Sequence, residues 1–284
     1  MKNPYKRLDI FKCDQEAHRH FGGRVSAYHV LKEKGCYPQG CLYFIWHCAR
    51  LEKGKRCVRG YNWAGKNCKG CTHFLEDKVN FQPRCTVSNA EFEAFQSDLE
   101  EFEVWWAAFE YKRKAVAGRI STVKPWFVEH IDSGRSQRRL RGYILVFRKG
   151  FFGISSFEDT FYVRVSQRQM ATHGFVHGMQ VELEGELRLD RGRVVVFFPK
   201  RIEVEGGCDD APWKRDRALV AMKTATLQEG QPEPCHACRW GVLADVEDMR
   251  SGELERYRRL YCLKGVNDPE ACYVVLWERL KRDV

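Results

Sequence analysis

The stretch that decides the fold runs from about Ala115 to Val204 and contains five apolar runs of strand length. These runs are AVAGRISTV (115–123), GYILVF (142–147), TFYVRV (160–165), QVELEGEL (180–187) and VVVFF (194–198), the last continuing through RIEV (201–204). Most of them alternate apolar and polar residues, as half-buried antiparallel strands do. The turn-forming DRGR (190–193) joins the last two runs. The stretch therefore predicts five strands, with one short helix from about Gln167 to His177 between the third and the fourth.

The fourth run carries the most specific pattern. GMQVELEGEL (178–187) has the form Gly-x-x-Val-x-Leu-x-Gly-x-Leu, and with the order of elements around it this stretch resembles the OB-fold. The resemblance covers about a third of the chain and implies a five-stranded β-barrel over residues 115–207 that binds nucleic acid. The expected fold class is α+β: an OB-like barrel preceded by an amphipathic helix, with a small cysteine-rich, metal-bound module at each end of the chain.

The composition is that of a globular protein. Hydrophobic residues make up 44% of the 284 residues and aromatic residues 13%, which suits two or three compact units. No window approaches the roughly 18 apolar residues of a membrane span, and the basic amino terminus has no apolar signal core. We therefore expect a cytoplasmic protein with no membrane partner. Because the cytoplasm keeps thiols reduced, the 13 cysteines favour metal binding over disulfides.

Four cysteines near the carboxyl end have the spacing of a metal site. Cys235 and Cys238 form a Cys-x-x-Cys pair, and Cys262 and Cys272 can complete a tetrahedron of thiolates. A helix from about Ala244 to Tyr261 is expected to deliver Cys262, and the first turn of a last helix is expected to hold Cys272.

A second set of cysteines lies in the amino-terminal part of the chain. Cys68 and Cys71 form its close pair, and Cys48 and Cys57 are the nearest cysteines that can complete a four-ligand site. Other candidates for these positions remain open: Cys36, Cys41, Cys85, His47 and His73.

The spacing of these cysteines leaves the metal open between zinc and iron. Structural zinc ribbons usually contain two close cysteine pairs, whereas each set here contains one pair and two isolated cysteines. Isolated cysteines at irregular spacing also suit a [4Fe–4S] cluster. We expect two Zn²⁺ ions, one in each module, with [4Fe–4S] as the alternative.

An amphipathic helix is predicted before the first strand. Ser88 and Glu91 form a capping box, and an aromatic stripe at helical spacing extends to Phe109 before the basic residues 112–114. The chain is thus expected to contain a basic cysteine-rich module (1–88), a connecting helix (89–114), the barrel (115–207), a linker (208–234) and a helical four-cysteine module (235–284).

Positive charge is concentrated in two of these segments. The chain has a net charge of +10; residues 1–88 hold 17 Lys and Arg against 7 Asp and Glu, and residues 115–207 hold 15 against 10. A polyanion is therefore the expected partner. Basic and aromatic residues around the first three strands are the candidates for backbone contacts and base stacking. They are Arg135, Arg138, Arg139, Arg141, Arg148, Lys149, Phe152, Tyr162 and Arg164.

The sequence contains no motif of a known reaction. A Gly-rich phosphate loop, a nucleophile elbow and a His-Glu-x-x-His run are all missing from it, so no catalytic residue is predicted. We expect a protein that binds nucleic acid, either single-stranded DNA or structured RNA. Two alternatives remain: an iron–sulfur protein that carries electrons or serves a redox enzyme as accessory subunit, and an adaptor that binds other proteins.

Overall fold

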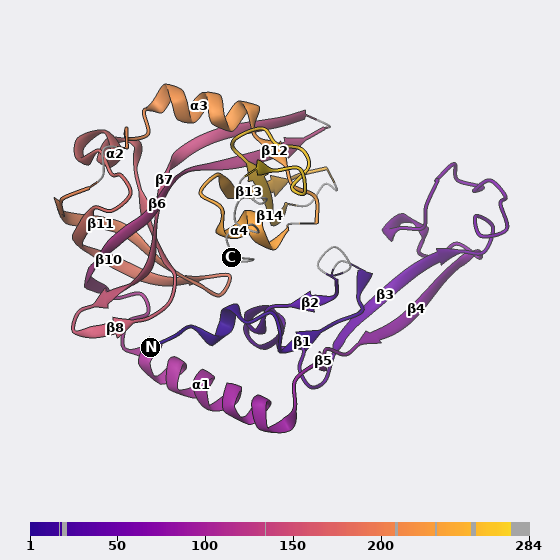
Figure 1. Ribbon diagram of the computed structural model, residues 1–284. Coiled ribbons are helices and arrows are strands. Elements are labelled where there is room, and N and C mark those ends of the chain that lie inside the picture. Colours follow the sequence, from indigo (N-terminus) through magenta and orange to yellow (C-terminus); the bar gives the residue numbers. More distant parts are fainter. Residues whose placement is uncertain are drawn as a thin grey trace. The chain divides into compact units, whose positions relative to one another are not determined.

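The computed structural model describes residues 1–16, 18, 22–133, 135–207, 210–230, 232–250 and 254–273. These residues form an α+β protein dominated by strands, in agreement with the expected class (Figure 1). The chain divides into two compact units. The larger contains Met1–Lys6 and Glu93–Val284, and the smaller contains Arg7–Phe92. Neither unit contains, among its described residues, a helix long and apolar enough to cross a membrane.

All five strands expected from the central stretch are present in the larger unit, in the expected order. They are β6 (Arg113–Asp132), β7 (Arg135–Phe152), β9 (Phe161–Val165), β10 (Gln180–Asp190) and β11 (Arg193–Glu205). They belong to a nine-stranded mixed sheet. Within it, β10 pairs with β11, β11 with β9, β9 with β7, β7 with β6, and β6 with β10. One pairing differs from the antiparallel expectation, because β9 and β11 run parallel. A helix and β10 lie between them in sequence, so β11 returns in the direction of β9.

The helix between the third and fourth strands is also confirmed, although it is shorter than expected. It is α2 (Gln167–His173), which begins at a capping box formed by Ser166 and Gln169. It ends at Gly174, whose left-handed conformation (φ 58°) satisfies the last turn. Gly185, the second glycine of the OB-like pattern, has a packing role: a Cβ there would lie 2.2 Å from Val196 Cγ1.

Strands β6 and β7 are much longer than the sequence predicted. They pair from Val116 and Phe152 as far as Asp132 and Arg135, where Ser133 (φ 46°) makes a tight turn. The segment expected as a basic connecting loop is therefore the first half of β7. The extension gives β6 a free edge, and β13 (Gly241–Asp248) pairs with it in parallel.

The carboxyl-terminal segment is a β-hairpin, so the helix expected over residues 244–261 is wrong. β13 is followed by β14 (Glu255–Cys262), and β14 also pairs with β12 (Thr226–Leu227). β13 alternates buried and half-buried residues with a period of two, as a strand does, and it lies between β14 and β6 in the sheet. The alternation is hard to recognise in the sequence because β13 contains charged residues.

Residues of the expected linker 208–234 contribute to the core of the larger unit. α3 (Arg215–Thr224) and the segment after it bury side chains against β6, β13 and β14. The helix α4 (Glu233–Ala237) follows and leads into β13. The shared core consists of Phe127, Met222, Ala225, Val242, Ala244, Tyr261 and Leu263.

The expected connecting helix is α1 (Asn89–Ala107), seven residues shorter than residues 89–114 allow. Ser88 and Glu91 form the predicted capping box at its start. The chain leaves the helix because Tyr111 adopts a left-handed conformation (φ 56°) and Arg113 begins β6. Phe102 and Trp106 on the aromatic stripe are buried, as predicted.

The first residues of the chain belong to the larger unit rather than to the amino-terminal module. The helical turn η1 (Pro4–Lys6) is held there by Asn3, which donates to Gly192 O (2.8 Å), and by Lys6, which pairs with Asp159 (2.5 Å). A short strand β8 (Ser155–Phe157) continues the sheet beyond β7.

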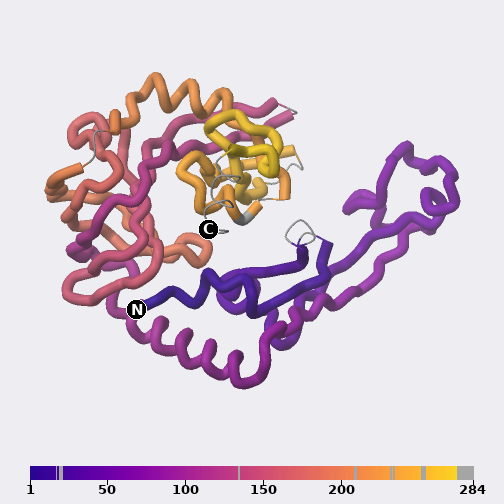
Figure 2. Tube along the Cα trace, viewed as in Figure 1, coloured from indigo at the N-terminus to yellow at the C-terminus, as the bar shows by residue number. Residues whose placement is uncertain are grey.

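The smaller unit has little regular structure and a small core. β1 (Phe11–Lys12), β2 (Arg24–Val25) and β5 (Arg84–Cys85) form one sheet, and a π-helical turn, η3 (His29–Glu33), follows β2. β3 (Cys41–Cys48) and β4 (Phe74–Phe81) form a separate hairpin. Residues 49–73 make a large loop that joins β3 to β4 and contains the helical turn η4 (Lys66–Cys68) (Figure 2).

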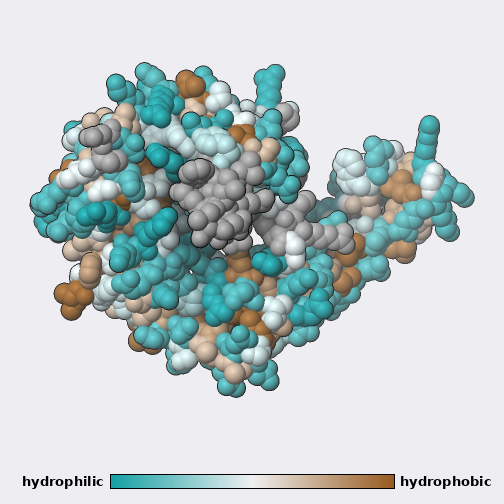
Figure 3. All heavy atoms as spheres, viewed as in Figure 1, coloured by the Kyte–Doolittle hydropathy of each residue, from teal (hydrophilic) through white to brown (hydrophobic). Residues whose placement is uncertain are grey.

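On the face shown in Figure 3, apolar residues gather only in small patches on a mostly hydrophilic surface.

Candidate functional site

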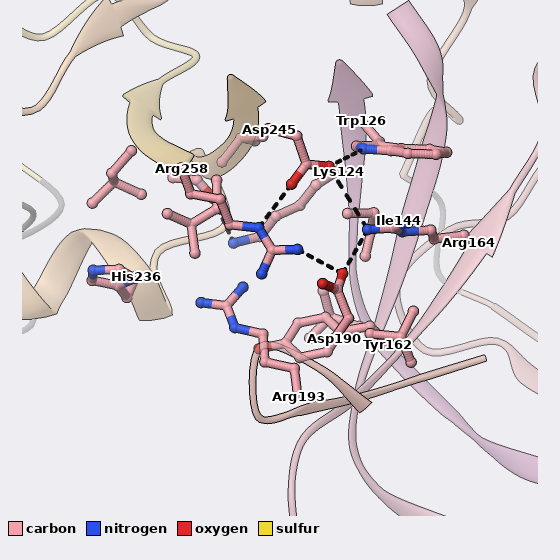
Figure 4. A pocket seen from close by; sticks show the side chains of 16 residues that line it. Lys124, Trp126, Ile144, Tyr162, Arg164, Asp190, Arg193, His236, Asp245 and Arg258 are labelled. Carbon is pink, nitrogen blue, oxygen red and sulfur yellow. Dashed lines mark hydrogen bonds and ion pairs between the residues drawn. The ribbon is translucent and has the colours of Figure 1, made fainter. Parts of the chain in front are cut away.

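Four charged side chains form an ion-pair cluster between β9 and the carboxyl-terminal hairpin (Figure 4). Asp190 Oδ2 accepts from Arg164 Nη2 (2.7 Å) and from Arg258 Nη2 (2.5 Å). Asp245 Oδ1 accepts from Arg258 Nε (2.8 Å), its cross-strand neighbour in the hairpin. Each carboxylate thus lies between two guanidinium groups. Only 17% of the Arg164 side chain and 14% of the Arg258 side chain are exposed, so the cluster is largely shielded from water.

Aromatic and basic side chains surround the ion-pair cluster. The Arg164 guanidinium lies 4.4 Å from the centre of the Trp126 ring, and Arg193 lies 5.4 Å from that of Tyr162. Burial lowers the pKa of Lys124 to about 8, and its ammonium donates to two backbone carbonyls of the α4–β13 segment. The remaining cavity measures about 100 Å³, well below the roughly 300 Å³ of a small-molecule pocket. Tyr162 and Arg164, two of the predicted nucleic-acid contacts, line this cavity.

Arg138, another predicted contact, is a structural residue of the same unit. It donates to Met222 O and Ala225 O (both 2.9 Å), and its guanidinium lies 4.3 Å from the centre of the Tyr261 ring. It also approaches Glu129, which is only 2% exposed. The Glu129 carboxylate is held by Ser136 (2.6 Å), Tyr261 (2.5 Å) and Arg259 (3.3 Å). The other predicted arginines of this strand, Arg135, Arg139 and Arg141, are exposed.

The aromatic candidate on β7, Phe152, and its neighbour Phe151 differ in exposure. Phe152 is fully buried, where it packs against Trp105, Phe157 and Phe161, so it has no face free for a base. Its neighbour Phe151 is 51% exposed. Successive side chains of a strand point to opposite faces, and the sequence alone did not reveal which of the two points outward.

A groove of about 1020 Å³ lies between the β6–β7 pair and α4. Four cations line it, Arg119 from β6, Arg148 and Lys149 from β7 and Arg239 after α4, together with the exposed ring of Phe151. Glu158 is the one carboxylate among its lining residues. Arg119, Arg148 and Lys149 are exposed and make no ion pair with any residue that the structure describes. We call this surface the groove.

The groove continues into a smaller cavity of about 230 Å³, with which it shares Arg239 and His177. Trp213 and Trp240 line this extension and meet edge to face, with ring centres 6.1 Å apart. Arg217 lies 4.9 Å from the centre of the Trp213 ring and adds a further cation. Arg148 and Lys149 of the groove were predicted from the sequence, but Arg119 was not, although it is a polar residue in the alternating run 115–123.

The four carboxyl-terminal cysteines lie close enough to influence one another. Cys235 and Cys238 belong to α4 and its end, Cys262 ends β14, and Cys272 follows on the next segment. Burial, and after it the neighbouring Cys238, Cys262 and Cys272, raise the pKa of the Cys235 thiol to about 11. The backbone N–H of Trp240 donates to Cys238 Sγ (3.4 Å). Gly241 allows this close turn, because a Cβ there would lie 1.8 Å from Cys235 O.

The amino-terminal set lies at one end of the β3–β4 hairpin. Cys48 ends β3, and Cys57, Cys68 and Cys71 belong to the loop 49–73. Backbone N–H groups donate to two of these sulfurs, from Arg59 to Cys57 (3.4 Å) and from Gly65 to Cys68 (3.5 Å). Such bonds are typical of cysteine turns that carry negative charge on sulfur.

Within the described residues, all cysteines are free thiols, and no set of three or more His, Cys, Asp or Glu side chains is arranged to hold a metal ion. Cys208 and most of the expected last helix lie outside the described residues.

Comparison of the chain with protein-family models, curated proteins and solved structures gives no match.

Proposed function

We propose that this chain binds single-stranded nucleic acid along the groove of an OB-like barrel. The single observation that supports this most strongly is the groove itself, in which three exposed cations without ion-pair partners, Arg119, Arg148 and Lys149, lie beside an exposed aromatic ring. Proteins that bind single strands combine a positive groove along the backbone with aromatic side chains on which bases stack.

The pairing of the strands supports the barrel. β6, β7, β9, β11 and β10 form a closed cycle of neighbours, and α2 lies between the third and fourth of them in sequence. Five strands in a Greek-key barrel with this helix are the OB arrangement. The barrel face over β9 is covered by the carboxyl-terminal hairpin, so we assign binding to the groove at the β6–β7 pair.

The aromatic residues favour a single strand over a duplex. Phe151 in the groove, and Trp213 and Trp240 in its extension, offer ring faces or edges that only unpaired bases can meet by stacking. A duplex keeps its bases stacked on one another, and would use the cations alone. Binding of a duplex as tightly as a single strand would contradict this assignment.

We also propose zinc in two places, on the donor chemistry of the two cysteine sets. Cys235, Cys238, Cys262 and Cys272 can supply four thiolates to one Zn²⁺, and Cys48, Cys57, Cys68 and Cys71 can supply four to another. Coordination requires rotation of these side chains onto a common point, since their present arrangement does not enclose an ion. When bound, zinc would neutralise the thiolates and hold α4 as one wall of the groove. A [4Fe–4S] cluster is the alternative, and visible absorbance of anaerobically purified protein distinguishes it.

The experiment is a salt titration with labelled oligonucleotides. Fluorescence anisotropy measures the affinity for oligo-dT, oligo-rU and a duplex, each longer than the roughly 4–16 nucleotides of one OB site. The groove variant Arg119→Gln/Arg148→Gln/Lys149→Gln should flatten the slope of log affinity against log salt by about two, at roughly 0.7 per lost contact.

The matched control removes the same number of charges elsewhere. Arg135, Arg139 and Arg141 are exposed at the other end of β7, and their replacement by Gln should leave the slope within one contact of the wild-type value. Equal losses in both variants would move the binding surface away from the groove. No binding of the wild type to any of the three probes at about 50 mM salt would overturn the nucleic-acid proposal and favour a redox or adaptor role.

A further inference from the structure

Three cysteines and a histidine gather around a small cavity in the smaller unit. Cys13 follows β1, His18 lies in the connection from β1 to β2, Cys36 follows η3 and Cys41 begins β3. All four line a cavity of about 10 Å³. Cys13 is absent from both cysteine sets that the sequence suggested, and Cys36 and Cys41 are not needed by the set in loop 49–73.

The three thiols lie close together around the cavity. Cys41 is within hydrogen-bonding reach of Cys36, and Cys13 is near enough to act on Cys36 electrostatically. Burial, followed by the nearness of Cys41, raises the pKa of the Cys36 thiol to about 12. Cys13 and Cys36 are each only 5% exposed, and none of the three forms a disulfide. Three thiols brought together from separate segments, two of them buried, are a costly arrangement unless something holds them there.

The histidine adds a fourth donor of the right kind. Nδ1 of His18 is buried and has no hydrogen-bond partner among the described residues. A buried imidazole nitrogen without a partner loses the energy of a hydrogen bond, whereas a metal ion would use its lone pair. His29 also lines the cavity, edge to face with His18 at 5.1 Å between ring centres. Its own Nδ1 is already paired with Glu33 (2.6 Å).

We propose that Cys13, Cys36, Cys41 and His18 form a third zinc site, in addition to the two sites proposed above. Three thiolates and one imidazole are a common structural donor set for Zn²⁺ in tetrahedral geometry. The cavity is too small for a substrate beside the ion, so the site is structural rather than catalytic. As in the other two sets, the donors must rotate onto one point to coordinate the ion.

The architecture of the smaller unit supplies the reason for such a site. Its three-stranded sheet consists of strands of two residues each, too short to be stable through their own hydrogen bonds. The four ligands come from the ends of β1, η3 and β3 and from the β1–β2 connection. One zinc ion would therefore fasten together segments that share only a small hydrophobic core, as in other small metal-dependent folds.

The test is the zinc content of the full-length protein, purified with reductant and measured by elemental analysis. The wild type should hold three zinc ions per chain, and Cys36→Ser should hold two. Cys85→Ser is the matched control in the same unit, because the Cys85 thiol donates to Val87 O (3.7 Å) away from the cavity, and this variant should keep three. An unchanged zinc content in Cys36→Ser would overturn the third site.

The fourth ligand is tested separately. His18→Ala should lower the zinc content or weaken retention against a chelator, whereas His29→Ala should leave both unchanged. Loss in His29→Ala alone would overturn the assignment of His18. If Cys36→Ser does not fold, alkylation of the wild type decides: Cys13, Cys36 and Cys41 should be protected before chelation and modified after it. Equal modification before and after chelation would contradict the proposal. So would a disulfide between Cys36 and Cys41 in the protein purified with reductant.

Discussion

The ion-pair cluster and the groove contain the same kinds of basic residue but differ in whether each cation has a partner. In the ion-pair cluster, Arg164 and Arg258 share Asp190 and Asp245, and all four side chains are largely buried. In the groove, Arg119, Arg148 and Lys149 are exposed, with no ion pair to a described residue. The two surfaces are built from neighbouring strands of one sheet.

This difference shows that a basic residue on a strand of this sheet is not by itself evidence of a nucleic-acid contact. A guanidinium that is buried and paired contributes to folding, and breaking the pair leaves an uncompensated charge. An exposed cation without a partner contributes little to folding but attracts polyanions over the length of the screening distance. Substitutions in the two surfaces should therefore affect different measurements.

The largest effect is expected from Asp190→Asn in the ion-pair cluster. Asp190 accepts from both Arg164 and Arg258, so the neutral amide leaves these two largely buried guanidinium groups with Asp245 as the one carboxylate of the cluster. We expect the free energy of unfolding to fall by about 3–5 kcal/mol, measured by urea denaturation. The affinity for oligo-dT of the remaining folded protein should be unchanged.

The control for this variant is an exposed pair in the same unit. Glu184 pairs with Arg201 (2.6 Å), whose side chain is 78% exposed. Glu184→Gln should change the free energy of unfolding by only about 0–1 kcal/mol. Similar losses in Asp190→Asn and Glu184→Gln would show that the ion-pair cluster is not protected from water, and would remove the contrast between the two surfaces.

A smaller effect is expected from acid, through Asp245. Burial acts to raise the pKa of this carboxyl, but the nearby Arg258 and Arg164 outweigh burial and hold the pKa below the ordinary value of 3.8. Because the folded-state pKa is the lower one, Asp245 stabilises the fold fully above the unfolded pKa. This contribution is lost as the pH falls through the folded pKa. The free energy of unfolding should therefore fall more steeply below about pH 4 in the wild type than in Asp245→Asn. Parallel curves would contradict the assigned role of Asp245.

The same comparison explains which parts of the fold the sequence could predict. The five central strands and α2 follow from local patterns: alternation in runs such as 180–187, and the capping residues Ser166 and Gly174. The hairpin of β13 and β14 could not be predicted in this way. Its charged residues Asp245 and Arg258 are buried because they find partners on other strands, and that information is not local.

The candidate site was predictable to a similar degree. Charge density pointed to the central sheet, where the groove lies, and Arg148 and Lys149, which line the groove, were predicted from their place after the second strand. The sequence could not distinguish Phe151 from Phe152, because the choice depends on how β7 pairs with β6. It also gave no sign that Arg138 would donate hydrogen bonds to the backbone carbonyls of Met222 and Ala225, which are far away in the chain.

A moderate effect on binding alone is expected from Phe151→Ala. Removal of the exposed ring should weaken binding to oligo-dT by about 1–3 kcal/mol, through loss of base stacking, without changing the salt slope. Phe198→Ala is the matched control, since Phe198 is similarly exposed (58%) and does not line the groove. Anisotropy titrations of both variants check this. Equal weakening by the two substitutions would show that Phe151 has no specific role.

The smallest effect is expected from a single charge, and it is also the sharpest test of the contrast between paired and unpaired cations. Arg148→Gln should flatten the slope of log affinity against log salt by about 0.7, the value of one phosphate contact with a single strand. Arg201→Gln removes one exposed arginine that is paired with Glu184 outside the groove, and should leave the slope unchanged. Neither substitution should alter the free energy of unfolding by more than about 1 kcal/mol, because both side chains are exposed. If Arg201→Gln changed the slope as much as Arg148→Gln, binding would depend only on the net charge of the protein. The groove would then not be the binding surface.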